Sequence, residues 1–208
     1  MLWIEAVRTL SADLEEPFEL EFVWRNLHEL NKLSWLNLMR EKITDQELNL
    51  LTELSERLIK NEPPQYIVGW AEFYELKFKV DERVLIPRPE TEELVEMILT
   101  ENNNDSLKIL DIGTGSGAIA ISLAKARQNW SVKASDISQN ALELAAENAK
   151  MNHVNLEFIQ SDVMDELTDR FDIIVSNPPY IAFDETYEMD DSVIKYEPDL
   201  ALFAQNQG

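Results

Sequence analysis

Residues 108–176 alternate between short apolar segments, typical of strands, and longer segments whose apolar residues recur at helical spacing. We expect strands at 108–112, 132–136, 156–160 and 172–176, and helices at 118–127 and 141–151. This alternation is typical of an α/β fold with a doubly wound, mostly parallel sheet, because each parallel pair needs a crossover long enough for a helix. Ligands bind such sheets beyond the carboxyl ends of the strands. The pattern therefore predicts a site at that edge.

The N-terminal part of the chain has apolar residues at helical spacing throughout. Thr44 and Glu47 have the spacing of a capping box, and Leu51 and Leu54 follow them on one helical face. We expect a small helical bundle over residues 1–70.

The segment after the bundle alternates apolar residues with lysines from 76 to 80, as a strand with one buried face does. The polar pair Asp81-Glu82 follows, and a second apolar run spans 84–86. We expect a hairpin with its turn at Asp81-Glu82. The predicted divisions of the chain are a helical domain at 1–70, a linking hairpin at 71–90 and an α/β domain at 91–208.

The chain is strongly acidic, with 18 Lys and Arg residues against 40 Asp and Glu residues and a net charge of −22. Proteins that bind nucleic acid through its phosphates present a basic face. We therefore expect no direct nucleic-acid partner. The acidity has two explanations, solubility and attraction of a basic protein partner, and solubility is the simpler one.

Cysteine is absent and the only histidines are His28 and His153, so we expect no disulfide and no metal cofactor. No apolar run approaches membrane-spanning length, and Glu5 interrupts the N-terminus before a signal-peptide core could form. We expect no membrane partner and a cytoplasmic location.

A glycine-rich loop follows the predicted strand at 108–112 and precedes a predicted helix. Its residues are Gly113, Thr114, Gly115, Ser116 and Gly117. Glycines at alternate positions let backbone amides approach a ligand closely. The loop also satisfies the relaxed dinucleotide pattern GxGxxG/A, so it predicts nucleotide binding without naming the nucleotide. A tight turn that packs strand on helix is the simpler structural alternative.

Acidic residues end the next two predicted strands. Asp136 can accept hydrogen bonds from both hydroxyls of a ribose, whichever nucleotide is bound. Asp162 can accept from an adenine amino group while Val163 packs against the ring. For Asp162, capping of the following turn is an equally good explanation.

Directly after the fourth predicted strand comes Asn177-Pro178-Pro179-Tyr180. An amide or aromatic amine nitrogen is a poor nucleophile, because its lone pair is delocalised. If the Asn177 side-chain oxygen and the Pro178 carbonyl each accept one N–H, that lone pair can point at an electrophilic methyl group. Pro179 stiffens the turn, and Tyr180 offers a flat face for a planar group. We expect Asn177, Pro178 and Tyr180 to be catalytic, and all four residues to bind the acceptor.

In isolation, Asn-Pro-Pro would more simply be a rigid turn at the end of a strand. Beside a glycine-rich nucleotide loop, it favours a site for methyl transfer to nitrogen. A dehydrogenase has no use for such a motif. The two motifs together predict S-adenosylmethionine as the cofactor, bound by the glycine loop, Asp136, Asp162, Val163 and Asn177.

Several further strings resemble one family, the bacterial peptide chain release factor glutamine methyltransferases, also called HemK-like proteins. The matching strings are Gln65-Tyr66-Ile67 with Gly69 and Glu72-Phe73-Tyr74, Leu85 to Glu92, Gly113 to Gly117, Asn177 to Tyr180, and Tyr196-Glu197-Pro198 before Ala201-Leu202. The Ile-Pro-Arg-Pro-Glu-Thr-Glu string within them is more specific than either general motif.

The resemblance implies a Rossmann-like S-adenosylmethionine-dependent methyltransferase. Its acceptor would be the side-chain amide of the glutamine in the Gly-Gly-Gln loop of class I release factors, and the helical domain would help to dock that partner. Arg88 and Glu90 look like scaffold of the site. Family members continue past Gly208, so we also expect a truncated chain. The strand at 172–176 would then be an unpaired edge of the sheet, with its apolar faces only partly covered.

Two other functions stay open from the sequence. A methyltransferase acting on adenine or guanine amines would use the same Asn-Pro-Pro-aromatic motif, although the net charge of −22 disfavours it. A shortened chain could instead bind a partner through its helical domain without catalysis.

Overall fold

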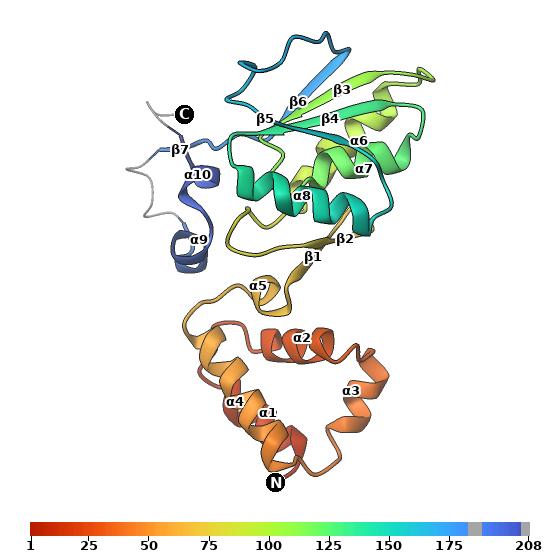
Figure 1. Cartoon of the computed structure of the whole chain (residues 1–208). Coiled ribbons are helices and arrows are strands. Elements are labelled where there is room, and N and C mark those ends of the chain that lie inside the picture. Colours follow the sequence, from red (N-terminus) through yellow and green to blue (C-terminus); the bar gives the residue numbers. More distant parts are fainter. Residues whose placement is uncertain (183–188, 205–208) are drawn as a thin grey trace. The chain divides into compact units, whose positions relative to one another are not determined.

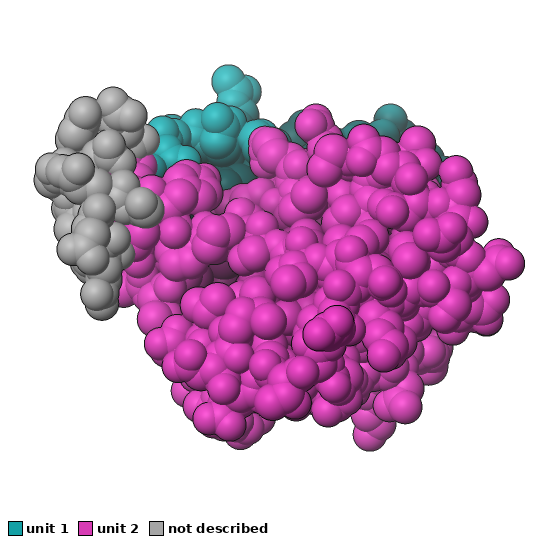
Figure 2. All heavy atoms as spheres, turned by 90° about the horizontal axis from the view of Figure 1, so that it is seen from above, with its two compact units in different colours: residues 1–69, 190–196 teal, residues 70–189, 197–208 magenta. Residues whose placement is uncertain are grey.

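The computed structural model describes residues 1–182 and 189–204. The chain divides into two compact units, coloured separately in Figure 2. Unit 1 comprises residues 1–69 and 190–196, and unit 2 comprises residues 70–189 and 197–208.

Unit 1 is helical. Its helices are α1 (Trp3–Leu10), α2 (Phe18–Leu27), α3 (Lys32–Leu38), α4 (Asp45–Ile59), α5 (Pro64–Val68) and α9 (Asp191–Tyr196). The core is built around three tryptophans: the ring of Trp3 lies edge-on to Trp24 and Trp35, with centroids 4.7 Å and 6.2 Å away. The predicted capping box is confirmed, because the Glu47 N–H donates to Thr44 Oγ1 and the Thr44 N–H donates to a Glu47 carboxylate oxygen.

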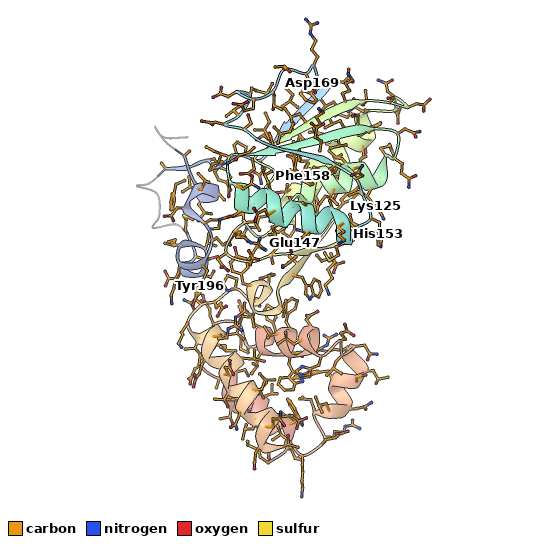
Figure 3. All side chains as sticks on the ribbon, viewed as in Figure 1. Lys125, Glu147, His153, Phe158, Asp169 and Tyr196 are labelled. Carbon is orange, nitrogen blue, oxygen red and sulfur yellow. The ribbon has the colours of Figure 1, made fainter. Side chains whose placement is uncertain are left out.

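Helix α9 joins unit 1 although it is distant in sequence. Lys195 Nζ and Tyr196 Oη both donate to the carbonyl of Lys60, at 3.0 Å and 3.1 Å. Figure 3 labels Tyr196 on α9. That carbonyl lies just beyond the C-terminus of α4, where the helix leaves acceptors without a partner. The two side chains therefore supply hydrogen-bond donors at the C-terminus of α4.

Unit 2 begins with a hairpin of β1 (Trp70–Phe73) and β2 (Leu76–Lys79). The chain does turn at Asp81-Glu82, since the Val84 N–H donates to the Asp81 carbonyl at 3.1 Å, but no strand follows at 84–86. The expected place of the hairpin is therefore wrong: its turn lies at Tyr74 and Glu75, which have φ of 49° and 60°. Glycine and asparagine usually occupy such left-handed turns, and neither is present here, so the sequence does not predict this turn. Tertiary structure supplies the stabilisation, because the Tyr74 N–H donates to a carboxylate oxygen of Glu92 at 2.9 Å.

The main sheet of unit 2 is parallel and has the order β5-β4-β3-β6 (Figure 1). Its strands are β3 (Lys108–Ile112), β4 (Ser131–Asp136), β5 (Glu157–Gln160) and β6 (Ile173–Ser176). Helices α6 (Glu90–Glu101), α7 (Ala118–Ala126) and α8 (Gln139–Met151) alternate with them in sequence. The predicted α/β fold class is confirmed.

Within the described residues, β6 is an edge strand. Ile174 is 55% exposed, whereas its neighbour Val175 is buried against β3. Alternate residues of a strand face opposite sides of a sheet, so one apolar face of β6 is open in this chain.

The remaining elements of unit 2 are β7 (Ile181–Ala182), α10 (Asp199–Leu202) and β8 (Phe203–Ala204), with β7 and β8 pairing in parallel.

Asn148 of α8 joins the hairpin to the glycine-rich loop: its side chain donates to the carbonyls of Lys79 and Ser116 and accepts the Lys79 N–H. Among the residues with described positions, no helix is long and apolar enough to cross a membrane.

Candidate active site

A cleft of about 360 Å³ opens in unit 2 at the carboxyl ends of the parallel strands. That volume lies within the range of small-molecule sites. Residues that follow each strand line it, together with two segments from outside the sheet. These residues include Ile112 to Ser116 after β3, Asp136 to Ser138 after β4, Ser161 to Val163 after β5, Ser176 to Pro179 at β6, and Val84, Leu85, Pro87, Arg88, Thr91, Pro198, Leu200 and Ala201.

The glycine-rich loop has two kinds of glycine. A Cβ atom at Gly113 or Gly115 would meet nothing within 4 Å, and both residues line the cleft. A Cβ at Gly117 would lie 2.7 Å from Cδ1 of Ile121 and 3.2 Å from Cβ of Ala145. The first two glycines therefore keep the cleft open, and Gly117 allows α7 to pack closely on α8.

Asp111 lies beneath this loop and was missed from the sequence. Its carboxylate oxygen Oδ2 accepts from Thr114 Oγ1 at 2.6 Å and from the Ala120 N–H at 3.3 Å. Asp111 is completely buried, and Oδ1 has no hydrogen-bond partner in the described structure. Burial raises the pKa of Asp111 from 3.8 to about 7, against the lowering effect of those two hydrogen bonds. A charged residue inside an apolar strand was the available sequence signal.

Asp136 lines the cleft at the end of β4, where the sequence predicted a ribose-binding carboxylate. One carboxylate oxygen accepts from the Gly115 N–H at 2.8 Å and the other from the Ser138 N–H at 2.9 Å. Each oxygen keeps lone-pair capacity for a further donor. The two bonds orient the carboxylate between the glycine loop and the start of α8.

Asp162 and Val163 also line the cleft, after β5. Val163 has a φ of 49° and is 58% exposed, so its side chain is open to a ligand. The following turn is tied by the neighbouring Ser161, whose hydroxyl accepts the Glu166 N–H at 3.2 Å. The Asp162 carbonyl accepts the Asp165 N–H at 3.1 Å, but in the described structure its side chain makes no hydrogen bond to this turn, so the predicted ligand-binding role of that side chain stays a prediction.

The Asn-Pro-Pro-Tyr segment leaves β6 at the same edge. Ser176 Oγ donates to the Ile112 carbonyl at 2.8 Å, which ties this segment to the start of the glycine loop. Asn177, Pro178 and Pro179 line the cleft. Tyr180 is outside the lining set and is 73% exposed, so its predicted role stays a prediction.

One wall of the cleft is held by a buried carboxylate. Glu197 accepts the Ile86 N–H at 3.0 Å and a guanidinium N–H of Arg88 at 2.6 Å. The Glu197 side chain is 1% exposed and that of Arg88 is 36% exposed. Arg88 therefore has the scaffold contacts that the sequence predicted, and Glu197 is the partner that only the structure identifies.

The structure thus brings most of the predicted site together. The residues that share the cleft are Gly113, Thr114, Gly115, Ser116, Asp136, Asp162, Val163, Asn177, Pro178 and Pro179. In residues 1–182 and 189–204, no cluster of three or more His, Asp or Glu side chains could hold a metal ion.

A parallel sheet with a glycine-rich loop and an Asn-Pro-Pro segment on one cleft defines a methyltransferase of the Rossmann-like class. Residues 90–196 match the model of the methyltransferase small domain, and residues 2–69 match that of the PrmC N-terminal domain. The hMettl16 catalytic domain, solved in complex with MAT2A 3'UTR hairpin 6, shows the same fold at 18% identity. Its TM-score is 0.51, and the likeness covers 64% of this chain and 52% of that one.

Relatives identify the particular family. The release factor glutamine methyltransferase of Lactococcus lactis subsp. lactis is 87% identical over the whole of this chain, which covers 77% of that protein. The protein of the same name from Streptococcus pneumoniae is 50% identical over 93% of this chain and 70% of its own length. The chain belongs to the release factor glutamine methyltransferase family. The predicted family and the predicted methyl donor, S-adenosylmethionine, are confirmed.

Proposed function

We propose that the cleft of unit 2 transfers the methyl group of S-adenosylmethionine to the side-chain amide nitrogen of the glutamine in the Gly-Gly-Gln loop of class I release factors. One observation supports the proposal above the others: the glycine loop and the Asn177–Pro179 segment line one cleft. The hydrogen bond from Ser176 to Ile112 holds the two segments together. Donor and acceptor sites that are adjacent and rigid are what a direct transfer between two bound groups requires.

The residues of the cleft fit the cofactor. Gly113 and Gly115 leave space that any side chain would occupy, so backbone amides can approach a ligand there. Asp136 offers carboxylate oxygens for ribose hydroxyls, and Val163 offers an exposed apolar surface for a flat ring. When bound, S-adenosylmethionine supplies an electrophilic methyl group on a sulfonium.

The acceptor side must orient a weak nucleophile. A carboxamide nitrogen attacks only when its lone pair is aimed at the methyl carbon, and two acceptors that each take one N–H impose that aim. The Asn177 side-chain oxygen and the Pro178 carbonyl are such acceptors, because neither can protonate the nitrogen. Methylation acidifies the nitrogen, so the released proton can pass to water and no strong base is needed.

The proposal extends to the partner and the location. The helical unit 1, which matches the PrmC N-terminal domain, would help to dock the release factor. The net charge of −22 disfavours nucleic acid as the acceptor and suits a basic protein surface. Release factors act in the cytoplasm, where we place this chain.

The test is transfer of a labelled methyl group from S-adenosylmethionine to a purified class I release factor, to transfer RNA and to DNA. We expect label in the release factor and a mass gain of one methyl on the glutamine. Asn177→Ala removes one of the two acceptors and should reduce the rate by about 100-fold or more. Asn155→Ala alters an exposed asparagine outside the cleft and should leave the rate unchanged. Label in nucleic acid alone would reject the proposal.

A further inference from the structure

A hydrogen bond links the acceptor segment to a residue 86 positions earlier in the chain. Asn177 Nδ2 donates to the hydroxyl Oγ1 of Thr91, with 3.3 Å between the two atoms. Both residues line the cleft. Thr91 is the second residue of α6 and belongs to the Ile-Pro-Arg-Pro-Glu-Thr-Glu string that the general methyltransferase motifs do not explain.

The orientation of the Asn177 carboxamide decides whether the proposed chemistry can occur. A half turn about the Cβ–Cγ bond exchanges the oxygen and the nitrogen, which replaces an acceptor by a donor. If the Asn177 side-chain nitrogen pointed toward the substrate, its N–H groups would face the N–H groups of the substrate glutamine. Two donors cannot form a hydrogen bond with each other. Asn177 is an exposed side chain, so close packing does not select one orientation. A specific partner for Nδ2 is needed.

The Thr91 hydroxyl is free to be that partner. A threonine in the first turn of a helix often serves as a cap, but the N-cap of α6 is Pro89 and no side chain caps this helix. The backbone of Thr91 is fixed, because its N–H donates to the carbonyl of Arg88 at 3.0 Å. Arg88 is in turn held by the buried Glu197. The hydroxyl therefore stands at a fixed place on the cleft wall.

We propose that Thr91 is a positioning residue for methyl transfer. By accepting an N–H from Asn177, it turns the Asn177 oxygen toward the glutamine amide and keeps the nitrogen away from it. This inference rests on the proposed function. Thr91 acts through Asn177, so its loss should lower the rate of transfer at saturation without weakening the binding of either substrate.

The test compares Thr91→Val, which removes the hydroxyl at nearly constant shape, with Thr91→Ser, which keeps it. Thr91→Ala is a second variant without the hydroxyl, in case the added methyl disturbs the cleft. Thr100→Val is the matched control: Thr100 lies in the same helix, outside the cleft, and its hydroxyl donates to Glu96 at 3.2 Å. The measurements are kcat and KM for methylation of the release factor, and the affinity for S-adenosylmethionine by calorimetry.

We expect Thr91→Val and Thr91→Ala to lower kcat by about tenfold, the effect of one ordinary hydrogen bond. In both variants, KM and cofactor affinity should stay within about twofold of the values for the unaltered chain. Thr91→Ser should retain roughly a third or more of the unaltered kcat. Thr100→Val should match the unaltered chain. An unchanged kcat in Thr91→Val and Thr91→Ala would overturn the inference. So would a Thr91→Ser variant as slow as Thr91→Val. The unaltered chain is assayed first. If it fails to methylate the release factor, the proposed function is rejected, and the role of Thr91 is not what failed.

Discussion

Replacing Gly117 by alanine would place a Cβ atom 2.7 Å from Cδ1 of Ile121 and 3.2 Å from Cβ of Ala145. Gly117 has a φ of +82°, and a side chain in that left-handed conformation costs about 1–2 kcal/mol. Ile121 is fully buried, so its methyl group cannot move into solvent, and overpacking of this kind costs about 1–3 kcal/mol. We expect Gly117→Ala to lower the free energy of unfolding by about 2–5 kcal/mol.

Gly115→Ala is the matched control in the same loop. Gly115 has a φ of +53°, but a Cβ there would meet nothing within 4 Å. This variant should lose only the backbone contribution of about 1–2 kcal/mol. Because Gly115 lines the cleft, its new methyl group would occupy space that we assign to the cofactor, and affinity for S-adenosylmethionine should fall by about tenfold or more.

Urea unfolding followed by circular dichroism measures the two free energies, and calorimetry measures the cofactor affinity. Equal losses of stability in the two variants would refute the packing role of Gly117. Unchanged cofactor affinity in Gly115→Ala would refute the assignment of the open part of the loop to the cofactor.

Two further predictions concern buried polar groups of unit 2. The pKa of Asp111 is raised from 3.8 to about 7 by burial, so its contribution to stability is complete below about pH 4 and is lost as the pH rises toward 7. Between about pH 4 and 7, this group lowers the unfolding free energy of the parent by up to about 1.4 kcal/mol per pH unit, and Asp111→Asn should abolish that decline. An identical pH dependence in variant and parent would contradict the assignment. Asn148→Ala would leave backbone groups of Lys79 and Ser116 without their side-chain partner, with an expected loss of about 2–4 kcal/mol in urea unfolding. The exposed Asn155→Ala should change stability by less than about 0.5 kcal/mol, and similar losses in both would show that the Asn148 bonds contribute little.

Much of the fold could be predicted because parallel strands buried on both faces appear as apolar runs. The strand expected at 108–112 is β3 with the same bounds. The helix expected at 141–151 begins two residues earlier, at Gln139, because Ser138 caps it by accepting the Ala141 N–H. Helix ends depend on such local hydrogen bonds, which periodicity does not detect.

The hairpin shows the opposite case. A turn does form at Asp81-Glu82, where Asp81 also pairs with the guanidinium of Arg83 at 2.7 Å, but it does not connect two strands. The turn of the hairpin, at Tyr74 and Glu75, has no residue that favours a positive φ. Its partner, Glu92, comes from α6, so only the folded chain reveals it.

The meeting of the candidate site residues in one cleft could be predicted because each lies at or just after the end of a strand. Strands that run parallel in one sheet end at one edge, so Gly115, Asp136, Val163 and Asn177 had to meet once the strands were assigned. Their supporting residues follow no such rule. Glu197 reaches the cleft wall from a segment that no strand pattern places there.

The sequence by itself determined the class of fold, the family and the chemistry, because hydrophobic periodicity and the residues after each strand are local properties of the chain. Tertiary structure decided how those residues are held. Thr91 meets Asn177 and Arg88 meets Glu197 across long stretches of chain, and Asp111 acquires its raised pKa from burial under the glycine loop. Hydrogen-bond partners and desolvation depend on which segments pack together in space, and the folded structure is needed to know that.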